Sequence, residues 1–467
     1  MSRRRSALAA AFVVAVTILA LSPVIRNGFL VVGFDDDAFI LDNPYIRELS
    51  WQNVWLCLTR FYHYDYLPLP MLSYLVEFQW WGTQPAGYHL TNLLLHAANA
   101  ALLFAVARRA LGSPTAALFA GLIFALHPVQ IESVSVIAQR KTLLSTGFVL
   151  AALLAYQLYR SGRRRWYPAA VLLYLGACGS KSSVIPFPLL LLLYDYTFQR
   201  ARWRVRDKLP FFALAITTAG VGAASKVGTE VVKVPQGGSY LATALAMSRV
   251  MWEYVDAMLL PLNLAPGYYY SPKEVFGVLN WTAAGALVLA TAALVRRRRE
   301  FPLTFFFAGW VGLCLLPVSN IVPISVLRAD RYLYLPMAGF ALWAGMGLAR
   351  LRQWALATGN RLHGLTARLP AVAMIVLAVL SWQYAAVWRS DVTAWTRTAV
   401  RHPWNARAPY LLAVAYMQRQ QLDVARRLAL ASLRLDPTFD RPRGLLADLD
   451  HDGAGAVVHS PGDVGGH

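Results

Sequence analysis

Residues 1–37, MSRRRSALAAAFVVAVTILALSPVIRNGFLVVGFDDD, contain the features that decide the fold. Three arginines precede an apolar run, Ala7–Ile25, and three aspartates follow it. A run of this length can cross the roughly 30 Å hydrocarbon core of a bilayer as a helix. A secretory signal peptide begins in the same way, but no small-x-small cleavage site follows Pro23. We therefore predict an uncleaved first membrane-spanning helix with acidic residues at its far end.

The composition of the whole chain agrees with a membrane protein. Of the 467 residues, 57% are hydrophobic and only 15% are charged, whereas soluble proteins carry about 25% charged residues. The length would suit roughly three soluble domains, but so little polar surface could not cover three cores. A net charge of +20 would indicate nucleic acid in a soluble protein. In a membrane protein Lys and Arg instead mark the cytoplasmic side, so we predict no nucleic-acid partner.

Apolar segments recur along the chain and predict an all-α, polytopic membrane bundle of about eleven spans. A further segment, Leu241–Leu260, places Arg249, Glu253 and Asp256 on one helical face, which favours a helix lying in the membrane interface. The eleven predicted spans begin near residues 7, 87, 114, 142, 166, 182, 209, 279, 302, 333 and 371.

Arginine clusters orient the predicted bundle. If Leu241–Leu260 does not cross, then Arg3–Arg5, Arg160–Arg165 and Arg296–Arg299 all fall on one side, which the positive-inside rule assigns to the cytoplasm. The N-terminus is then inside and the C-terminus outside. Because the chain is rich in Arg and poor in Lys, we favour a bacterial source. We predict a multi-pass protein of the cytoplasmic (inner) membrane whose active site and C-terminus face the periplasm.

The predicted membrane domain covers residues 1–388 and includes a first extracytoplasmic loop, 33–86. Residues 389–440 are predicted to form helices of the tetratricopeptide-repeat (TPR) type, with an ordinary helical pair that caps the bundle as the alternative. Residues 441–467 are predicted to be disordered. The residues at the packing offsets of one repeat are Leu412, Ala413, Tyr416, Ala425 and Pro437.

The first outer loop opens with adjacent carboxylates, Asp35, Asp36 and Asp37, and continues to Asn43. Adjacent carboxylates repel one another, which raises the proton affinity of at least one of them unless a cation lies near. Such a carboxylate can take a proton from an attacking hydroxyl group. The alternative is a solvated acidic turn. Because basic residues are expected opposite this run of three aspartates, we predict that either Asp35 or Asp36 is a general base.

Basic side chains from three separate loops lie at the same outer level of the predicted bundle. Charged groups so close to hydrocarbon are costly and often functional. Gathered in one cavity they would bind a phosphate or diphosphate, whereas singly each could anchor a helix end to lipid headgroups. As a set, they predict an anion-binding pocket. The residues are Arg140, Lys141, Lys181, Arg328 and Arg331.

Further polar residues lie near the outer helix ends. Hydrogen bonding between helices is the simplest role for one stripe of His and Asn side chains, and substrate contacts from its outer members, His89 and Asn92, are the alternative. His127 and Glu132 are candidates for metal ligands or for partners of Arg140. A divalent cation therefore stays open as a cofactor, and no cofactor is required. The full stripe is His89, Asn92, His96 and Asn99.

Taken together, these motifs resemble the transmembrane-and-TPR (TMTC) proteins, which are membrane glycosyltransferases of the GT-C superfamily related to the protein O-mannosyltransferases. The resemblance runs in order through residues 1 to about 440. It implies a catalytic acid after the first span and transfer of a sugar, typically mannose, from a polyprenyl phosphate to Ser or Thr. The stretches that carry it are Asp35–Pro44, Tyr66–Leu69, Tyr88–His96, His127–Ser133, Arg140–Lys141, Ser180–Lys181 and Asp330–Pro336.

By this resemblance, Asp35 and Asp36 are the paired acids of the family. Gln130, Gln139 and Thr142 stand where bacterial relatives often have His, Glu and Asp, which leaves the donor sugar and any metal open. The residues that would hold the donor phosphate are Arg140, Lys141, Lys181 and Arg331.

The sequence thus predicts an inverting glycosyltransferase that uses a polyprenyl-phosphate hexose, works among membrane lipids, and docks a protein or glycan acceptor on its tail. One alternative is a GT-C glycosyltransferase that modifies lipid A or polysaccharide. The other is a non-catalytic membrane TPR protein for docking or assembly. The latter predicts that truncation after Trp388 destroys function, whereas replacement of Lys181 and Arg331 does not.

Overall fold

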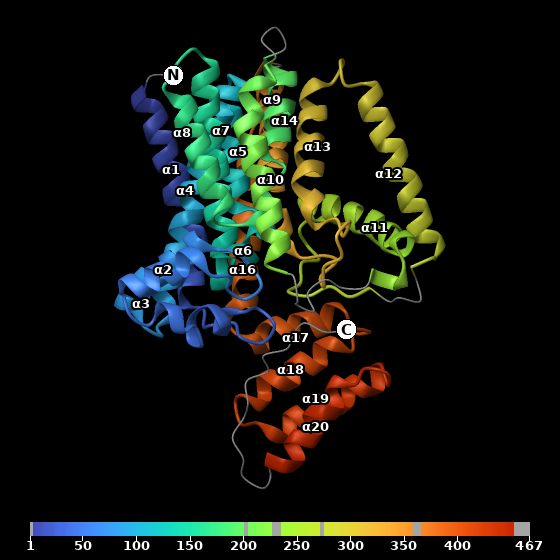
Figure 1. Cartoon of the computed structure of the whole chain (residues 1–467). Coiled ribbons are helices and arrows are strands. Elements are labelled where there is room, and N and C mark those ends of the chain that lie inside the picture. Colours follow the sequence, from blue (N-terminus) through green and yellow to red (C-terminus); the bar gives the residue numbers. More distant parts are fainter. Residues whose placement is uncertain (1–2, 200–203, 227–234, 271–274, 358–365, 453–467) are drawn as a thin grey trace.

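The structure is a computed structural model that describes residues 3–199, 204–226, 235–270, 275–357 and 366–452. Within these ranges the secondary structure is helical throughout, apart from one isolated bridge between Tyr62 and Asp65. The all-α prediction is therefore confirmed. Most helices stand side by side in a bundle, and a smaller group of helices lies beyond one end of it (Figure 1).

Each predicted span corresponds to a helix, and all of these helices except α12 belong to the bundle. Within the described residues, five helical stretches are long and apolar enough to cross a membrane, or six if the bent pair Pro114–Leu126 and Pro128–Ser135 counts as one. The number of spans therefore stays a prediction. The helices are α1 (Arg3–Leu21), α4 (Pro85–Leu111), α5 (Pro114–Leu126), α7 (Arg140–Arg160), α8 (Trp166–Cys178), α9 (Phe187–Phe198), α10 (Leu209–Ala224), α12 (Val278–Arg296), α13 (Pro302–Leu315), α14 (Pro336–Ala357) and α16 (Leu369–Ala385).

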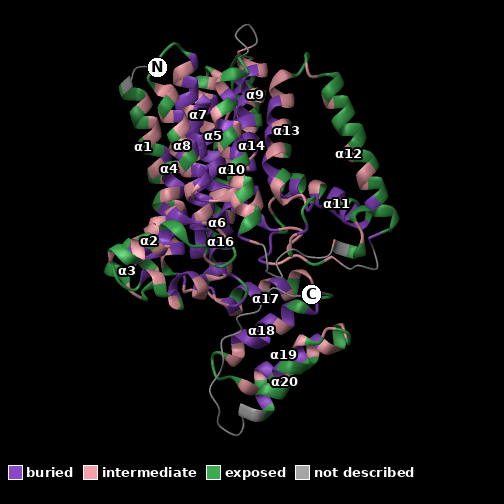
Figure 2. Cartoon of the chain, in the orientation of Figure 1, coloured by how far each residue is buried: buried purple, intermediate pink, exposed green. Residues whose placement is uncertain are grey.

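Helix α11 (Tyr240–Leu259) runs across the direction of its neighbours α12 and α13, as expected for an interfacial helix (Figure 1). Its polar residues are used in ion pairs, because Glu253 lies 2.9 Å from Arg249 and 2.8 Å from Arg328. Helix α12 stands apart from the bundle and is largely exposed (Figure 2).

The two ends of the bundle differ in what they carry. The N-terminus and the α12–α13 turn lie at one end, whereas α2 (Trp51–Thr59), α3 (Pro68–Trp81) and the C-terminal helices lie at the other (Figure 1). The predicted outer loop and the tail therefore share one end of the molecule. Which end faces the cytoplasm stays a prediction.

The described part of the tail contains four helices, one of which lies where disorder was predicted. Residues 441–467 were expected to be unstructured, but 441–452 form a helix because Leu445 and Leu449, one turn apart, are buried to 6% and 4% exposure. Residues 453–467 lie outside the described residues. Whether the tail is a TPR module stays a prediction. The helices are α17 (Asp391–Arg401), α18 (Arg407–Met417), α19 (Leu422–Leu435) and α20 (Arg441–Asp452).

A buried cluster of charges joins α7, α9 and the start of α10 at the end opposite the tail. Arg160 lies 2.7 Å from Asp195 and 3.5 Å from Asp207, and Lys208 pairs with both aspartates. The side chains of Asp195 and Lys208 are fully buried. A buried charge that loses its partner is strongly destabilising, so this cluster holds the three helices in register.

We predict that Asp195→Asn destabilises the protein by about 3–5 kcal/mol, the usual cost of removing one partner from a buried ion pair. Thermal unfolding of the protein in lipid nanodiscs measures the effect as a lower Tm. The matched control is Asp423→Asn, which removes an exposed carboxylate from α19 and should leave the Tm unchanged. Equal Tm values for both variants would show that the cluster does not hold the helices.

Candidate active site

The two acids considered as a general base have different surroundings. Asp36 is fully buried, and its carboxylate accepts hydrogen bonds from the backbone N–H of Leu30 at 3.0 Å and of Ala138 at 2.8 Å. Burial raises the pKa of Asp36 well above its usual value, although these hydrogen bonds oppose the shift. Asp36 thus connects the loop after α1 to the segment before α7 and has no access to solvent.

Asp35, by contrast, is accessible: its side chain is 44% exposed and its backbone has a left-handed φ of 70°. Burial alone would raise its pKa, but the neighbouring imidazole of His63 and the positive charges of Lys141 and Arg331 outweigh that effect. The pKa of Asp35 is therefore lowered. An ionised carboxylate that faces solvent and cations can accept a proton from a substrate.

His63 is a site residue that the sequence did not indicate. Its Nε2 lies 3.6 Å from the carboxylate of Asp35. It occupies a tight turn, closed by the bridge between Tyr62 and Asp65, in which His63 and Tyr64 have left-handed φ values of 46° and 63°. Non-glycine residues in this conformation cost free energy and cluster at functional sites. A lone histidine in a loop carries no sequence signal of its distance from an acid in another segment.

Two of the predicted cations, Lys141 and Arg331, act on the carboxylate of Asp35, and Lys181 lies near both of them. Lys141 lies 3.7 Å from Asp65, and its Nζ sits 5.0 Å from the centre of the Phe39 ring. Arg331 donates to Glu132 through its side chain at 2.5 Å and through its backbone N–H at 2.8 Å. Lys141, Lys181 and Arg331, which come from separate loops, therefore lie near one another, and their role in binding phosphate stays a prediction. Glu132 binds Arg331, so its predicted pairing with Arg140 is wrong.

Lys181 is the most perturbed of these cations. Burial lowers its pKa to about 7, and the positive charges of Lys141 and Arg331 add to the shift. Its Nζ donates to the hydroxyl of Thr142 at 2.8 Å. Lys181 and Arg331 line the same small cavity of about 30 Å³. This cavity has room for one or two water molecules, so a phosphate group would have to displace side chains as it binds.

Arg140 lies in a separate buried cluster. Its guanidinium is fully buried and pairs with Glu77, while Nε donates to Asn92 and Nη2 to the backbone carbonyl of Tyr88, both at 2.9 Å. The guanidinium carbon also lies over the Tyr74 ring, 4.9 Å from the ring centroid. Because these donors are committed to the protein, we expect Arg140 to fix the start of α7 instead of binding phosphate directly.

The polar stripe of α4 forms hydrogen bonds between helices, as predicted. His96 donates from Nε2 to the carbonyl of Ala125 at 3.0 Å and accepts at Nδ1 from the hydroxyl of Tyr334 at 2.7 Å. His89 donates to the carbonyl of Gly28 at 3.3 Å. The remaining members bond to backbone carbonyls: Asn92 to Val134 and Val136, and Asn99 to Leu143.

Three further candidates have local structural roles. Asn43 is buried and caps the turn Pro44–Ile46 by accepting from the N–H of Tyr45 at 3.0 Å. Asp37 is half-buried and begins the single π-helical turn Asp37–Leu41. His127 donates to the carbonyl of Met258 at 3.1 Å, away from Arg140. The described residues contain no group of three or more His, Cys, Asp or Glu placed to hold a metal ion.

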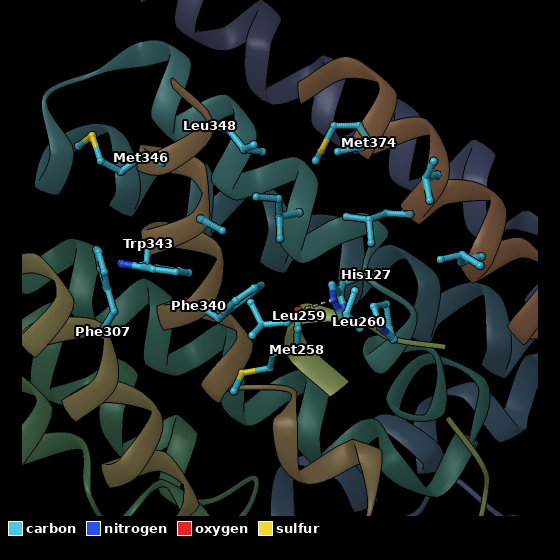
Figure 3. Close-up of a pocket in the computed structure, with 18 of the residues that line it drawn as sticks. His127, Met258, Leu259, Leu260, Phe307, Phe340, Trp343, Met346, Leu348 and Met374 are labelled. Carbon is cyan, nitrogen blue, oxygen red and sulfur yellow. Dashed lines mark hydrogen bonds between the residues drawn. The ribbon is translucent and has the colours of Figure 1, made fainter. Parts of the chain in front are cut away.

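A second cavity, of about 590 Å³, has almost entirely apolar walls. Residues from α5, α13, α14 and α16 and from the end of α11 line it, among them Met258, Phe307, Phe340, Trp343 and Met374 (Figure 3). His127 also lines it, with its Nε2 bonded to the backbone carbonyl of Met258 (Figure 3). Because Asp35, Lys181 and Arg331 do not line this cavity, it is distinct from the charged site.

We predict that the cation cluster binds a phosphodiester lipid more weakly as the pH rises from about 6 to about 8. Lys181, with a pKa of about 7, is mostly protonated at the lower pH and mostly neutral at the higher one. A phosphodiester keeps its single charge throughout, so binding should weaken about tenfold. Equilibrium binding of a fluorescent lipid phosphodiester measures this. Lys181→Met should bind weakly with little pH dependence; a flat wild-type profile would contradict the assignment.

No protein-family model matches the chain, but individual relatives do. The chain is 21% identical over 433 residues to a protein O-mannosyl-transferase of Caenorhabditis elegans. This alignment covers 87% of this chain and 60% of the relative. It is 30% identical over 374 residues to the protein O-mannosyl-transferase TMTC3 of Mus musculus, covering 68% of this chain and 40% of the relative. The chain thus spans at most about 60% of the length of these relatives.

Among solved structures, the crystal structure of ArnT from Cupriavidus metallidurans bound to undecaprenyl phosphate aligns with 97% of this chain and 78% of its own. The TM-score is 0.42 and the sequence identity 16%. The resemblance inferred from the motifs is confirmed by the curated relatives: this chain is similar to the TMTC-type protein O-mannosyl-transferases over most of its length.

Proposed function

We propose that the chain is an integral-membrane GT-C glycosyltransferase that moves a hexose, typically mannose, from a polyprenyl-phosphate donor to a Ser or Thr hydroxyl of a protein. One observation carries the proposal: the exposed carboxylate of Asp35 lies near Lys141 and Arg331, and Lys181, from a third segment, lies near both of these cations. The similarity to protein O-mannosyl-transferases supports the same reaction. The protein would act in the cytoplasmic membrane with this site on the periplasmic side.

In the proposed reaction the acceptor hydroxyl oxygen attacks the anomeric carbon of the donor sugar. The bond from that carbon to the phosphate oxygen breaks, and the polyprenyl phosphate leaves with the electron pair. Asp35 takes the hydroxyl proton as general base, while Lys181 and Arg331 stabilise the negative charge on the departing phosphate. His63, beside Asp35, would orient the carboxylate. Attack opposite the leaving group inverts the anomeric carbon.

The different surroundings of Asp35 and Asp36 indicate a different role for each acid. Asp35 faces solvent and the cations, so it is our candidate for the base. Asp36 is enclosed and bonded to two backbone N–H groups, so we assign it the role of holding the loop. An asparagine at position 36 could accept only one of those two hydrogen bonds with its single carbonyl oxygen.

Mass spectrometry of cell-envelope proteins from cells with and without this chain tests the proposed acceptor. Loss of a hexose from Ser or Thr sites when the chain is absent is the expected result. Loss of the sugar from lipid A or polysaccharide, with protein sites unchanged, would instead support the related glycosyltransferase with a glycan or lipid acceptor. An unchanged glycan profile in all three fractions would contradict the proposal.

We predict that Asp35→Asn lowers kcat by about 10²–10⁴-fold, the range for loss of a general base, without lowering the Tm. Asp36→Asn should lower the Tm as well as the rate, since it removes a buried backbone contact. Sugar transfer and thermal unfolding are measured on the same purified samples. Full transfer by Asp35→Asn would rule out Asp35 as the base, and an unchanged Tm for Asp36→Asn would refute its structural role.

A further inference from the structure

The first helix of the tail contacts the loop that carries the acids. Asp391, in the first turn of α17, accepts hydrogen bonds from the backbone N–H of Val31 at 3.3 Å and of Val32 at 3.1 Å. Val31 and Val32 are separated from the acidic run by Gly33 and Phe34 only, and they lie about 360 positions from Asp391 in sequence. The carboxylate of Asp391 is largely buried, at 9% exposure for the residue. It therefore satisfies two backbone donors that would otherwise be enclosed without a partner.

Trp395, one helical turn later, contacts the same loop from a second direction. Its indole N–H donates to the carbonyl of Val32 at 2.8 Å, and its ring stacks on Phe34 with centroids 5.2 Å apart. Gly33 lies against the indole: a Cβ there would come within 3.1 Å of the Trp395 ring, and its φ of 82° favours glycine. The loop conformation and the position of the indole are thus fitted to each other.

The contact continues on both sides of these residues. The N–H of Gly28 donates to the carbonyl of Arg389 at 3.1 Å, and the Phe34 ring meets Trp388 edge-on at 5.3 Å. The tail therefore touches the loop at several successive positions from Gly28 to Phe34. One residue further on is Asp35.

The opposite side of this turn is held by the bundle. Asp36 accepts from the N–H of Leu30 and of Ala138, and its own N–H donates to the carbonyl of Leu30 at 3.2 Å. Leu30 to Asp36 is consequently a closed turn held by the approach to α7 on one side and by α17 on the other. Asp35 occupies this turn in a left-handed conformation, so its carboxylate direction depends on both supports.

We propose that Asp391 and Trp395 are positioning residues for Asp35, so that the start of the tail forms part of the active site. This inference rests on the proposed glycosyltransferase function. It changes the meaning of one simple experiment: truncation after Trp388 removes both residues, so loss of function on truncation does not distinguish a docking tail from an enzyme. Point variants of α17 make that distinction.

The proposal predicts a specific kinetic pattern. Small displacements of a catalytic group can cost about 10²-fold in rate, so Asp391→Ala and Trp395→Phe should lower kcat by about 10–100-fold. The donor KM should change less than about twofold, because Lys181 and Arg331 are held by Thr142 and Glu132, which lie outside α17. A tail that only stabilises the fold would lower the amount of active enzyme and the Tm while leaving kcat per folded molecule unchanged.

The test combines this kinetic split with hydrogen–deuterium exchange of the full-length protein in nanodiscs. In Asp391→Ala, the amides of Val31 and Val32 should exchange faster, while exchange across α7 stays as in the wild type. Asp391→Asn, which keeps one acceptor oxygen, should recover part of the kcat. Asp423→Asn in α19 is the matched control, because it removes an exposed tail carboxylate away from the loop, and it should behave as wild type.

Unchanged exchange at Val31 and Val32, or unchanged kcat in the folded variants, would overturn the proposal. If Asp391→Ala does not fold, Trp395→Phe decides, since it keeps an aromatic ring and loses only the indole and its N–H. If the wild type transfers no sugar from polyprenyl-phosphate hexoses, the proposed function fails. Faster exchange in Asp391→Ala would then still show that α17 holds the loop, and unchanged exchange would refute that too.

Discussion

A carboxylate enclosed by protein, that of Asp36, determines how the rest of the site is arranged. By accepting the backbone N–H groups of Leu30 and Ala138, it joins the loop after the first helix to the start of α7, which carries Lys141. The neighbouring Asp35 is consequently turned outward toward His63 and the cations. Because successive side chains in a tight turn point in different directions, one acid of the pair can be structural while the other stays accessible.

The basic residues near this end of the bundle fall into two groups. Arg140 and Arg328 are paired with Glu77 and Glu253 and stack on tyrosine rings, so they connect segments of the protein. Lys181 is half-buried, donates to a hydroxyl group and has a pKa lowered to about 7. A desolvated cation in this state gains most from an anionic ligand, because the ligand supplies the charge that its surroundings do not. This contrast is why we place the donor phosphate next to Lys181.

Much of the architecture could be predicted from the sequence, because apolar segments and arginine clusters are local signals. The helices, the direction of α11 across its neighbours and the proximity of Lys141, Lys181 and Arg331 agree with such patterns. The local signals did not predict α20, because only two buried leucines mark this otherwise polar segment. They also did not predict that Glu132 pairs with Arg331. The contacts of His63 with Asp35 and of Asp391 with Val31 depend on tertiary packing across many residues, which spacing along one chain does not encode.

A structure of the protein with a bound, non-hydrolysable polyprenyl-phosphate hexose analogue tests the central claim most directly. We predict that the phosphate lies within hydrogen-bond distance, about 3 Å, of Lys181 and Arg331, with the anomeric carbon facing Asp35 and the small cavity opened by movement of its walls. A phosphate bound elsewhere, such as at the apolar cavity beside Phe340 and Trp343, with Asp35 remote from the sugar, would contradict the assignment of this site.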